Sequence, residues 1–227
     1  MTFPLCITAL QVLSSEECQK IIDCCTPYVE DALVQRGKPG AETGEKNIET
    51  RKSKVVLIAA DDQRFQSIQE ELSKVVNAMI DISRFQFSIP IVGIEAIQFA
   101  SYEEGDFYDY HLDSSTMFPR NMSASLMLSH PSEYKGGLLN FRDLLQEDEK
   151  TLEQDLQQGE LGVFPSLLIH KVTPIKEGRR CALVLWGFIQ EVHNAMTKQQ
   201  SNTDSDGYES HNEPNDTQPN NNDPMIF

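Results

Sequence analysis

The stretch GDFYDYHLDSS, residues 105–115, places a histidine and several acids in a segment whose aromatic residues are typical of a β-strand. Because side chains alternate between the two faces of a strand, His111 and Asp113 are expected to point the same way, roughly 6.6 Å apart along it. Both could bind one metal ion at about 2.0–2.2 Å. Asp109 is also in phase, and we interpret it as an outer neighbour of the ligands or as solvent-exposed. Two ligands hold a metal weakly, so a third is expected elsewhere.

Outward from this stretch, the second half of the chain reads as short strands separated by Gly and Pro, without a long helix between them. The expected strands cover residues 92–102, 107–113, 123–130, 138–143, 160–166, 168–175 and 179–189. The charged segment 142–160 interrupts them and is expected to be an exposed loop or a short helix.

The first half of the chain predicts helices. Residues 13–29 combine a serine cap with apolar residues at helical spacing, and residues 61–85 repeat apolar residues along one face. Residues 35–51 read as a loop and residues 53–59 as a strand. Helices followed by antiparallel strands predict an α+β domain whose sheets form a jelly roll or cupin-like sandwich, with the N-terminal helices packed on one sheet.

Composition divides the chain into three parts. Residues 1–93 are expected to form a helical and strand support region of the same domain, and residues 94–190 its core. Residues 191–227 are rich in Asn, Asp, Ser, Gln and Pro, and we interpret them as an acidic disordered tail.

The charge and cysteine content exclude several classes. A formal net charge of −16 disfavours nucleic acid and anionic membrane surfaces as partners. The start has no signal-peptide pattern, and no apolar run is long enough to span a bilayer. The five cysteines are odd in number and lack CxxC spacing, which favours reduced thiols and a cytoplasmic location.

His170 is the candidate third ligand. It lies in an apolar strand-like context, where an unpaired imidazole would be costly. Together with His111 and Asp113 it would form the two-histidine, one-carboxylate set of non-haem Fe(II) oxygenases, which leaves sites open for a co-substrate. Ten residues later, Arg180 begins a strand with apolar in-phase neighbours, so its guanidinium is expected to need an anionic partner. 2-Oxoglutarate would fit, with its keto acid end on iron and its distal carboxylate on Arg180.

Four motifs carry a family resemblance. The pattern Y-x(5)-Y-x-x-H-x-D at residues 102–113, YKGGLLNF at 134–141, GELGVFPSLLIHKVTPIKEGRR at 159–180 and LVLWGF at 183–188 resemble the 2-oxoglutarate- and Fe(II)-dependent dioxygenases of the prolyl 4-hydroxylase type, particularly the PKHD-type hydroxylases. The resemblance covers about residues 5–189 and is strongest from about residue 94.

The resemblance implies a double-stranded β-helix, iron bound by His111, Asp113 and His170, and the co-substrate carboxylate bound by Arg180. It also implies hydroxylation with succinate and CO2 as co-products, and ascorbate as the reductant that keeps iron ferrous. A prolyl residue of a protein or peptide is the leading substrate, with another protein side chain or a free small molecule as alternatives.

Two further residues are assigned by resemblance, and two positions depart from it. Tyr102 resembles the tyrosine that hydrogen-bonds the co-substrate, and Thr173 is placed beside it as an auxiliary contact. Ala182 stands where some subfamilies carry serine, and the apolar residues 126–128 stand where collagen-type enzymes carry a tyrosine. The co-substrate contacts are therefore expected to differ in detail.

Three other readings remain open at this point. One is a non-catalytic, cupin-like sensor or interaction module that binds metal or 2-oxoglutarate. Another is a zinc hydrolase that uses Asp113 or Asp109 as base, and a third is an inert structural His/Asp pair. The complete ligand set together with Arg180 favours the oxygenase, because a hydrolase leaves Arg180 unexplained.

Overall fold

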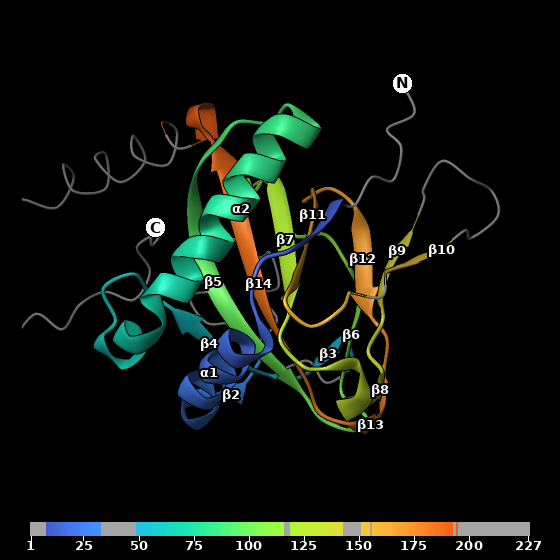
Figure 1. Ribbon diagram of the computed structural model, residues 1–227. Helices are drawn as coiled ribbons and strands as arrows, with labels where there is room; N and C mark the ends of the chain where they lie inside the picture. Colours follow the sequence, from blue (N-terminus) through green and yellow to red (C-terminus); the bar gives the residue numbers. More distant parts are fainter. Residues whose placement is uncertain are drawn as a thin grey trace, which may run out of the picture.

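The computed structural model describes residues 8–32, 49–115, 119–142, 151–154, 156–192 and 194. Two β-sheets face each other, and the helices cover the outer face of the larger one (Figure 1). The helical elements are α1 (Ser15–Cys25), η1 (Thr26–Tyr28), η2 (Gln63–Ile68), α2 (Gln69–Phe87) and η3 (Pro131–Glu133). The strands are β1 (Thr8–Gln11), β2 (Glu30–Asp31), β3 (Arg51–Lys52), β4 (Lys54–Ile58), β5 (Ile91–Tyr102), β6 (Phe107–His111), β7 (Met122–Met127), β8 (Tyr134–Gly136), β9 (Leu139–Arg142), β10 (Thr151–Gln154), β11 (Glu160–Pro165), β12 (Ile169–Val172), β13 (Ile175–Gly178) and β14 (Arg180–Ile189).

The sheet order places late strands beside early ones. The larger sheet runs β1-β11-β7-β14-β5-β4-β2 and the smaller runs β10-β9-β12-β6-β3, with β13-β8 as a separate pair. β14 lies between β5 and β7, antiparallel to both. This is the predicted double-stranded β-helix, and it brings β12 alongside β6 in the smaller sheet.

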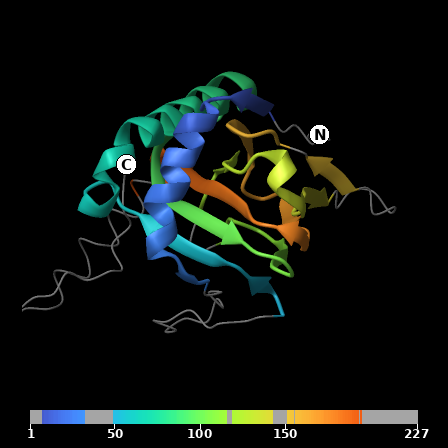
Figure 2. The same ribbon diagram turned by 60° about the horizontal axis from the view of Figure 1, so that its bottom comes forward.

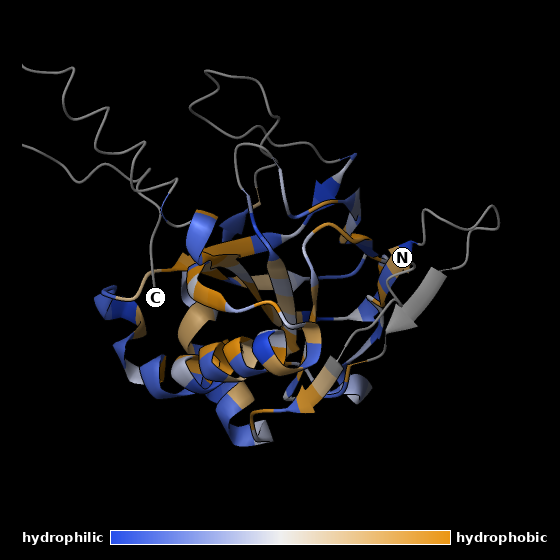
Figure 3. Cartoon of the chain, turned by 90° about the horizontal axis from the view of Figure 1, so that it is seen from above, coloured by the Kyte–Doolittle hydropathy of each residue, from blue (hydrophilic) through white to orange (hydrophobic). Residues whose placement is uncertain are grey.

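Two apolar clusters fill the molecule. The larger lies between the helices and the larger sheet, and Figure 2 shows α1 and α2 side by side over that face. The smaller lies between the two sheets and contains Ala100, Tyr102, Leu139, Phe141, Phe164, Val172 and Ile175. In Figure 3 hydrophobic segments gather in the middle of the molecule and hydrophilic ones lie outside. The second cluster is the one that surrounds the candidate site.

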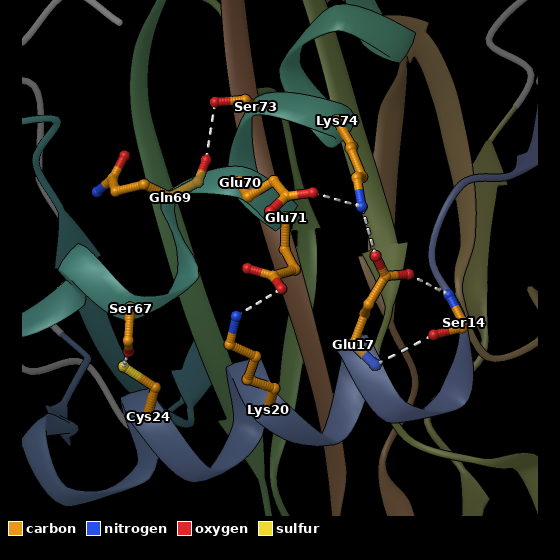
Figure 4. A network of polar contacts seen from close by, with 10 residues as sticks. All are labelled: Ser14, Glu17, Lys20, Cys24, Ser67, Gln69, Glu70, Glu71, Ser73 and Lys74. Carbon is orange, nitrogen blue, oxygen red and sulfur yellow. Dashed lines mark hydrogen bonds and ion pairs between the residues drawn. The ribbon is translucent and has the colours of Figure 1, made fainter.

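A polar network joins the two helices (Figure 4). Ser14 and Glu17 form a capping box at the start of α1, as the serine cap predicted. Glu17 also accepts from Lys74 of α2 at 2.7 Å, and Glu71 of α2 accepts from Lys20 of α1 at 2.6 Å. These contacts fix the two helices against each other at the solvent side of the larger cluster.

Two expectations about this fold were wrong. Segment 142–160 contains β10, which pairs with β9 and extends the smaller sheet, instead of only a loop or helix. The edge strand β1, paired with β11, had no counterpart in the prediction. Charged and polar residues are tolerated in such edge strands because one side faces solvent, which weakens the apolar alternation on which the prediction depends.

Other expectations fall on residues outside those described. The predicted loop at 35–51 is described only from residue 49, and the predicted tail only to residue 192 and at 194. Strands β1, β2 and β4 of the N-terminal region pair within the larger sheet. The division into a support region, a core and a tail stays a prediction. Among the described residues, no helix is both long and apolar enough to cross a membrane.

Candidate active site

Two histidines meet across neighbouring strands of the smaller sheet. His111 ends β6 and His170 lies in β12, where the two are directly paired, with ring centroids 4.2 Å apart. The Nδ1 atoms lie 2.8 Å from the backbone carbonyls of Asp109 and Leu168 respectively. In each imidazole the Nδ1–H donates to a backbone carbonyl, so the Nε2 keeps a lone pair that can bind a cation.

The Asp113 carboxylate completes a three-residue cluster. Its Oδ1 lies 3.5 Å from Nε2 of His111, and its Oδ2 lies 3.4 Å from Nε2 of His170. The candidate ligand atoms all lie within 4.8 Å of one another. Charged hydrogen bonds are shorter, about 2.7–2.9 Å, and Oδ2 is buried without a hydrogen-bond partner in the described part of the chain. The donor set and the orphaned oxygen fit a divalent metal ion with ligands at about 2.0–2.2 Å.

Asp113 reaches this cluster by a different route from the one predicted. β6 ends at His111, so strand alternation does not extend to Asp113. Its N–H donates instead to the carbonyl of Ser166 at 3.2 Å, in the connection before β12. The exposed Leu112 lies between the two candidate ligands. The prediction that both side chains face one way on a strand was wrong, although it named residues that do meet.

The protonation states suit metal binding. Burial raises the pKa of Asp113, but the two neighbouring imidazoles and the Ser123 hydroxyl lower it by a larger amount. The pKa of Asp113 therefore lies below its usual range. Burial lowers the pKa of His170 to about 4, although Asp113 opposes this shift. At neutral pH the carboxylate is therefore charged and His170 is neutral, which are the forms that bind metals.

The aromatic ring of Tyr108 stacks on His111. The Tyr108 ring lies parallel to it, 3.6 Å between centroids and 13° between planes. The Arg51 guanidinium carbon lies 4.5 Å from the centroid of the Tyr108 ring in a cation–π contact, and the Arg51 Nε donates to the Ser53 hydroxyl. Sequence reasoning assigned no specific role to Tyr108 or Arg51. Tyr108 packs directly on a candidate ligand.

Arg180 is buried in the core between the sheets. It is 1 % exposed. Of the residues that the structure describes, none accepts a hydrogen bond from its Nε, and its guanidinium carbon lies 5.5 Å from the centroid of the Tyr102 ring in a cation–π contact. A Cβ on Gly137 would come within 2.7 Å of the Arg180 Cδ. The backbone thus leaves room for the Arg180 guanidinium, which has no anionic partner in the described part of the chain.

Tyr102 and Thr173 differ in their contacts. Tyr102 is 3 % exposed and pairs in register with Arg180. The Thr173 hydroxyl accepts a hydrogen bond from the N–H of Leu138 at 2.9 Å. Thr173 therefore has a local structural partner in addition to any role toward a ligand.

The side chains of His130 and Asp109 are not part of the cluster. His130 caps η3, where its Nδ1 accepts from the Ser132 N–H. The carboxylate of Asp109 accepts from the N–H of Tyr110, so Asp109 supports His111 through its backbone carbonyl. His193 and His211 lie outside the described residues.

Sequence reasoning missed Arg120, which the fold brings to the cluster. Its guanidinium donates to the Asp113 carbonyl at 3.4 Å and to both oxygens of Glu95 at 2.7 Å. It also stacks on Trp186, 4.0 Å from the ring centroid. The only available signal was an isolated basic residue seven positions after Asp113, which by itself is not specific.

The sequence is similar to a known protein family and to several hydroxylases. Residues 97–188 match the model of the 2OG-Fe(II) oxygenase superfamily. A PKHD-type hydroxylase of Crocosphaera subtropica is 31% identical over 117 residues, which are 49% of this chain and 51% of the relative. One from Gloeothece citriformis is 30% identical over 136 residues, 57% of this chain and 60% of the relative. The chain thus spans about half to three fifths of these curated relatives.

Solved structures share the fold. A Pseudomonas putida prolyl-4-hydroxylase superposes with a TM-score of 0.61 at 21% identity, over 80% of this chain and 91% of that one. A Trichoplax adhaerens prolyl hydroxylase, solved with a hypoxia inducible factor peptide fragment, gives 0.67 at 19% identity, over 83% and 86%. These matches agree with the resemblance found in the sequence: residues 97–188 are similar to the 2OG-Fe(II) oxygenase superfamily, and PKHD-type hydroxylases are similar to this chain in sequence.

Proposed function

We propose that this chain is an Fe(II)- and 2-oxoglutarate-dependent dioxygenase that hydroxylates an unactivated C–H bond. The observation that carries the proposal is the buried Arg180, which has no anionic partner among the described residues and lies in the same fold interior as the His111, Asp113 and His170 cluster. A zinc hydrolase needs the cluster but has no use for this guanidinium. A carboxylate-bearing co-substrate uses both.

The three clustered side chains are the proposed iron ligands. His111 and His170 offer their Nε2 atoms and Asp113 a carboxylate oxygen, which is a donor set suited to Fe(II). Bound iron supplies the oxidative chemistry, in which O2 and 2-oxoglutarate give succinate and CO2 and one oxygen atom enters the substrate C–H bond. Ascorbate is the proposed reductant that keeps iron ferrous.

Arg180 is the proposed anchor for the distal carboxylate of 2-oxoglutarate. A guanidinium fork binds a carboxylate bidentately, and burial strengthens the pair. Tyr102 pairs with Arg180 across the neighbouring strand, and its hydroxyl would donate to the co-substrate. Thr173, between β12 and β13, would be a further contact.

The apolar cluster between the sheets keeps water away from the site. Phe164 and Phe141 lie against His170, with ring centroids 4.9 and 5.8 Å from its imidazole. These walls orient the ligand and shield the reaction from solvent.

The proposed substrate is a prolyl residue of a protein or peptide, and a free small molecule is the alternative. Names of the structural relatives support this choice, since both are called prolyl hydroxylases and one was solved with a peptide. The net charge of −16 argues against nucleic acid and anionic membranes as partners. The cysteines Cys18, Cys24, Cys25 and Cys181 are free thiols, which supports a reducing, cytoplasmic location.

The test is stoichiometric product formation. Purified chain with Fe(II), ascorbate, 2-oxoglutarate and O2 is expected to form succinate, and proline-containing peptides are expected to gain one oxygen by mass spectrometry. Peptides with proline replaced by alanine serve as controls. Succinate formation without proline oxidation in any peptide would overturn the substrate assignment only. Binding of 2-oxoglutarate with no succinate would overturn the activity and favour a sensor.

A further inference from the structure

Asp113 is the cluster member that no strand holds in place. His111 and His170 are fixed by β-pairing and by hydrogen bonds from Nδ1 to backbone carbonyls. Asp113 lies beyond the end of β6, and its N–H and that of Ser114 donate to one acceptor, the Ser166 carbonyl, at 3.2 and 3.3 Å. These backbone contacts hold one side of the turn only. The carbonyl of Asp113 needs a separate restraint.

Arg120 provides that restraint. Its Nη1 donates to the Asp113 carbonyl at 3.4 Å. A contact of this length is weak by itself, so its effect depends on how firmly the guanidinium is held.

The guanidinium is held from two other sides. Glu95 of β5 accepts from Nε and Nη2 at 2.7 Å each, which is a bidentate pair, and the two side chains are only 18% and 13% exposed. Trp186 of β14 lies under its plane, 4.0 Å from the guanidinium carbon to the ring centroid. Arg120 thereby connects two central strands of the larger sheet to the turn that bears Asp113.

We infer that Arg120, held by Glu95 and Trp186, is a positioning residue that keeps Asp113 in its metal-binding place. The inference rests on the proposed function, because it assumes that the cluster binds a metal. Groups that orient metal ligands typically change metal affinity by about 10–100-fold when they are removed.

Metal affinity can be measured without turnover. The full chain is titrated with Co(II) at neutral pH, by calorimetry and by the visible absorption that reports ligand geometry. Both Arg120→Gln and Glu95→Gln are expected to raise the Co(II) dissociation constant by about tenfold or more and to change the absorption intensity. Arg120→Lys is expected to be intermediate, because it keeps the charge and one donor but loses the fork.

A purely electrostatic effect gives a different pattern. Glu95→Gln leaves the guanidinium charge unbalanced near the cation, so repulsion alone would also weaken Co(II) binding in this variant. Arg120→Gln removes the positive charge, and repulsion alone would then leave binding unchanged or tighter. Weaker binding in both variants therefore supports positioning, and unchanged or tighter binding in Arg120→Gln overturns it.

Two controls separate positioning from general destabilisation. Glu71→Gln removes another buried carboxylate, paired with Lys20 at 2.6 Å between the helices, and is expected to leave Co(II) binding unchanged. The double variant Glu95→Gln with Arg120→Gln is expected to bind no more weakly than Arg120→Gln alone, because Glu95 acts through Arg120. Additive losses in the double variant would overturn the inference.

Failure of the two proposals can be told apart. If His111→Ala binds Co(II) as tightly as wild type does, the proposed metal site is wrong, and the inference is wrong with it. His111-dependent binding that is indifferent to Arg120→Gln would overturn the inference alone. Thermal unfolding of each metal-free variant shows that the compared proteins are folded.

Discussion

His111 and His170 are directly opposed cross-strand partners on β6 and β12, and this pairing sets the separation of their imidazoles. Opposed residues in an antiparallel pair have Cβ atoms about 4.5–5.5 Å apart. The strand register therefore brings the two rings together. The cluster is largely preformed by the backbone.

Removal of either imidazole is expected to abolish tight Fe(II) binding and turnover. In His170→Ala the remaining His111 and Asp113 supply only two ligands, and the same holds for His111→Ala. His130→Ala is the matched control, since His130 caps η3 away from the cluster. Binding is measured with Co(II) or Fe(II) under argon. Unaltered metal affinity in both cluster variants would contradict the assigned ligands.

Arg180→Ala is expected to raise the 2-oxoglutarate concentration needed for half-maximal succinate formation by at least tenfold, because a charged hydrogen-bonded pair contributes about 1.5–3 kcal/mol. Metal affinity should change little. Arg84→Ala, an exposed arginine in the last turn of α2, controls for loss of one positive charge. An unchanged 2-oxoglutarate requirement would show that the co-substrate carboxylate binds elsewhere.

Gly137→Ala is expected to impair 2-oxoglutarate binding through Arg180. Gly137 has φ +66°, and an added Cβ would lie 2.5 Å from Ile175 Cδ1 and 2.7 Å from Arg180 Cδ. Gly105→Ala is a close control, because Gly105 has φ +80° but its nearest neighbour would be Lys52 Nζ at 3.8 Å. Both variants should lose about 1–2 kcal/mol of stability from left-handed backbone strain. Only Gly137→Ala should also need more 2-oxoglutarate, as titration of succinate formation would reveal.

Glu17 is expected to make unfolding sensitive to acid. Its hydrogen bonds with Lys74 and the Ser14 N–H lower the pKa of Glu17 from 4.5 to about 2. A lowered pKa in the folded state means that the stabilisation is complete above pH 4.5 and is lost as pH falls toward 2. Glu17→Gln keeps the capping-box geometry but removes the charge. Urea unfolding should show a stability difference between wild type and variant that shrinks across this range; a constant difference would contradict the assignment.

Much of the fold could be predicted because its signals are local. The serine cap at Ser14 and the apolar spacing of residues 61–85 indicated helices, and these lie at α1, η2 and α2. The expected strands coincide with β5, β6, β7, β9, β11, β12 and β14. Strand alternation alone does not say which face meets which layer, so the sequence did not show that Leu126 and Leu128 lie in the cluster beneath the helices.

The site was predictable where spacing along the chain reflects chemistry, and not where the fold alone brings residues together. His111, Asp113, His170 and Arg180 could be named from residue type and context. Arg120 could not, because its partners Glu95 and Trp186 lie 25 and more residues away in sequence and meet it only through the sheet order β14-β5. The turn that carries Asp113 was misread as strand because the alternation of polar and apolar residues continues one step past the last ladder pair.

The two candidate histidine ligands and Arg180 belong to opposite layers, since β6 and β12 lie in the smaller sheet and β14 in the larger. If both ends of the co-substrate are bound as proposed, the distance between the two sheets selects the length of its carbon chain. A keto diacid one carbon shorter or longer than 2-oxoglutarate could bind well at the metal cluster or at Arg180, but not at both. Oxaloacetate and 2-oxoadipate are therefore expected to be poor replacements.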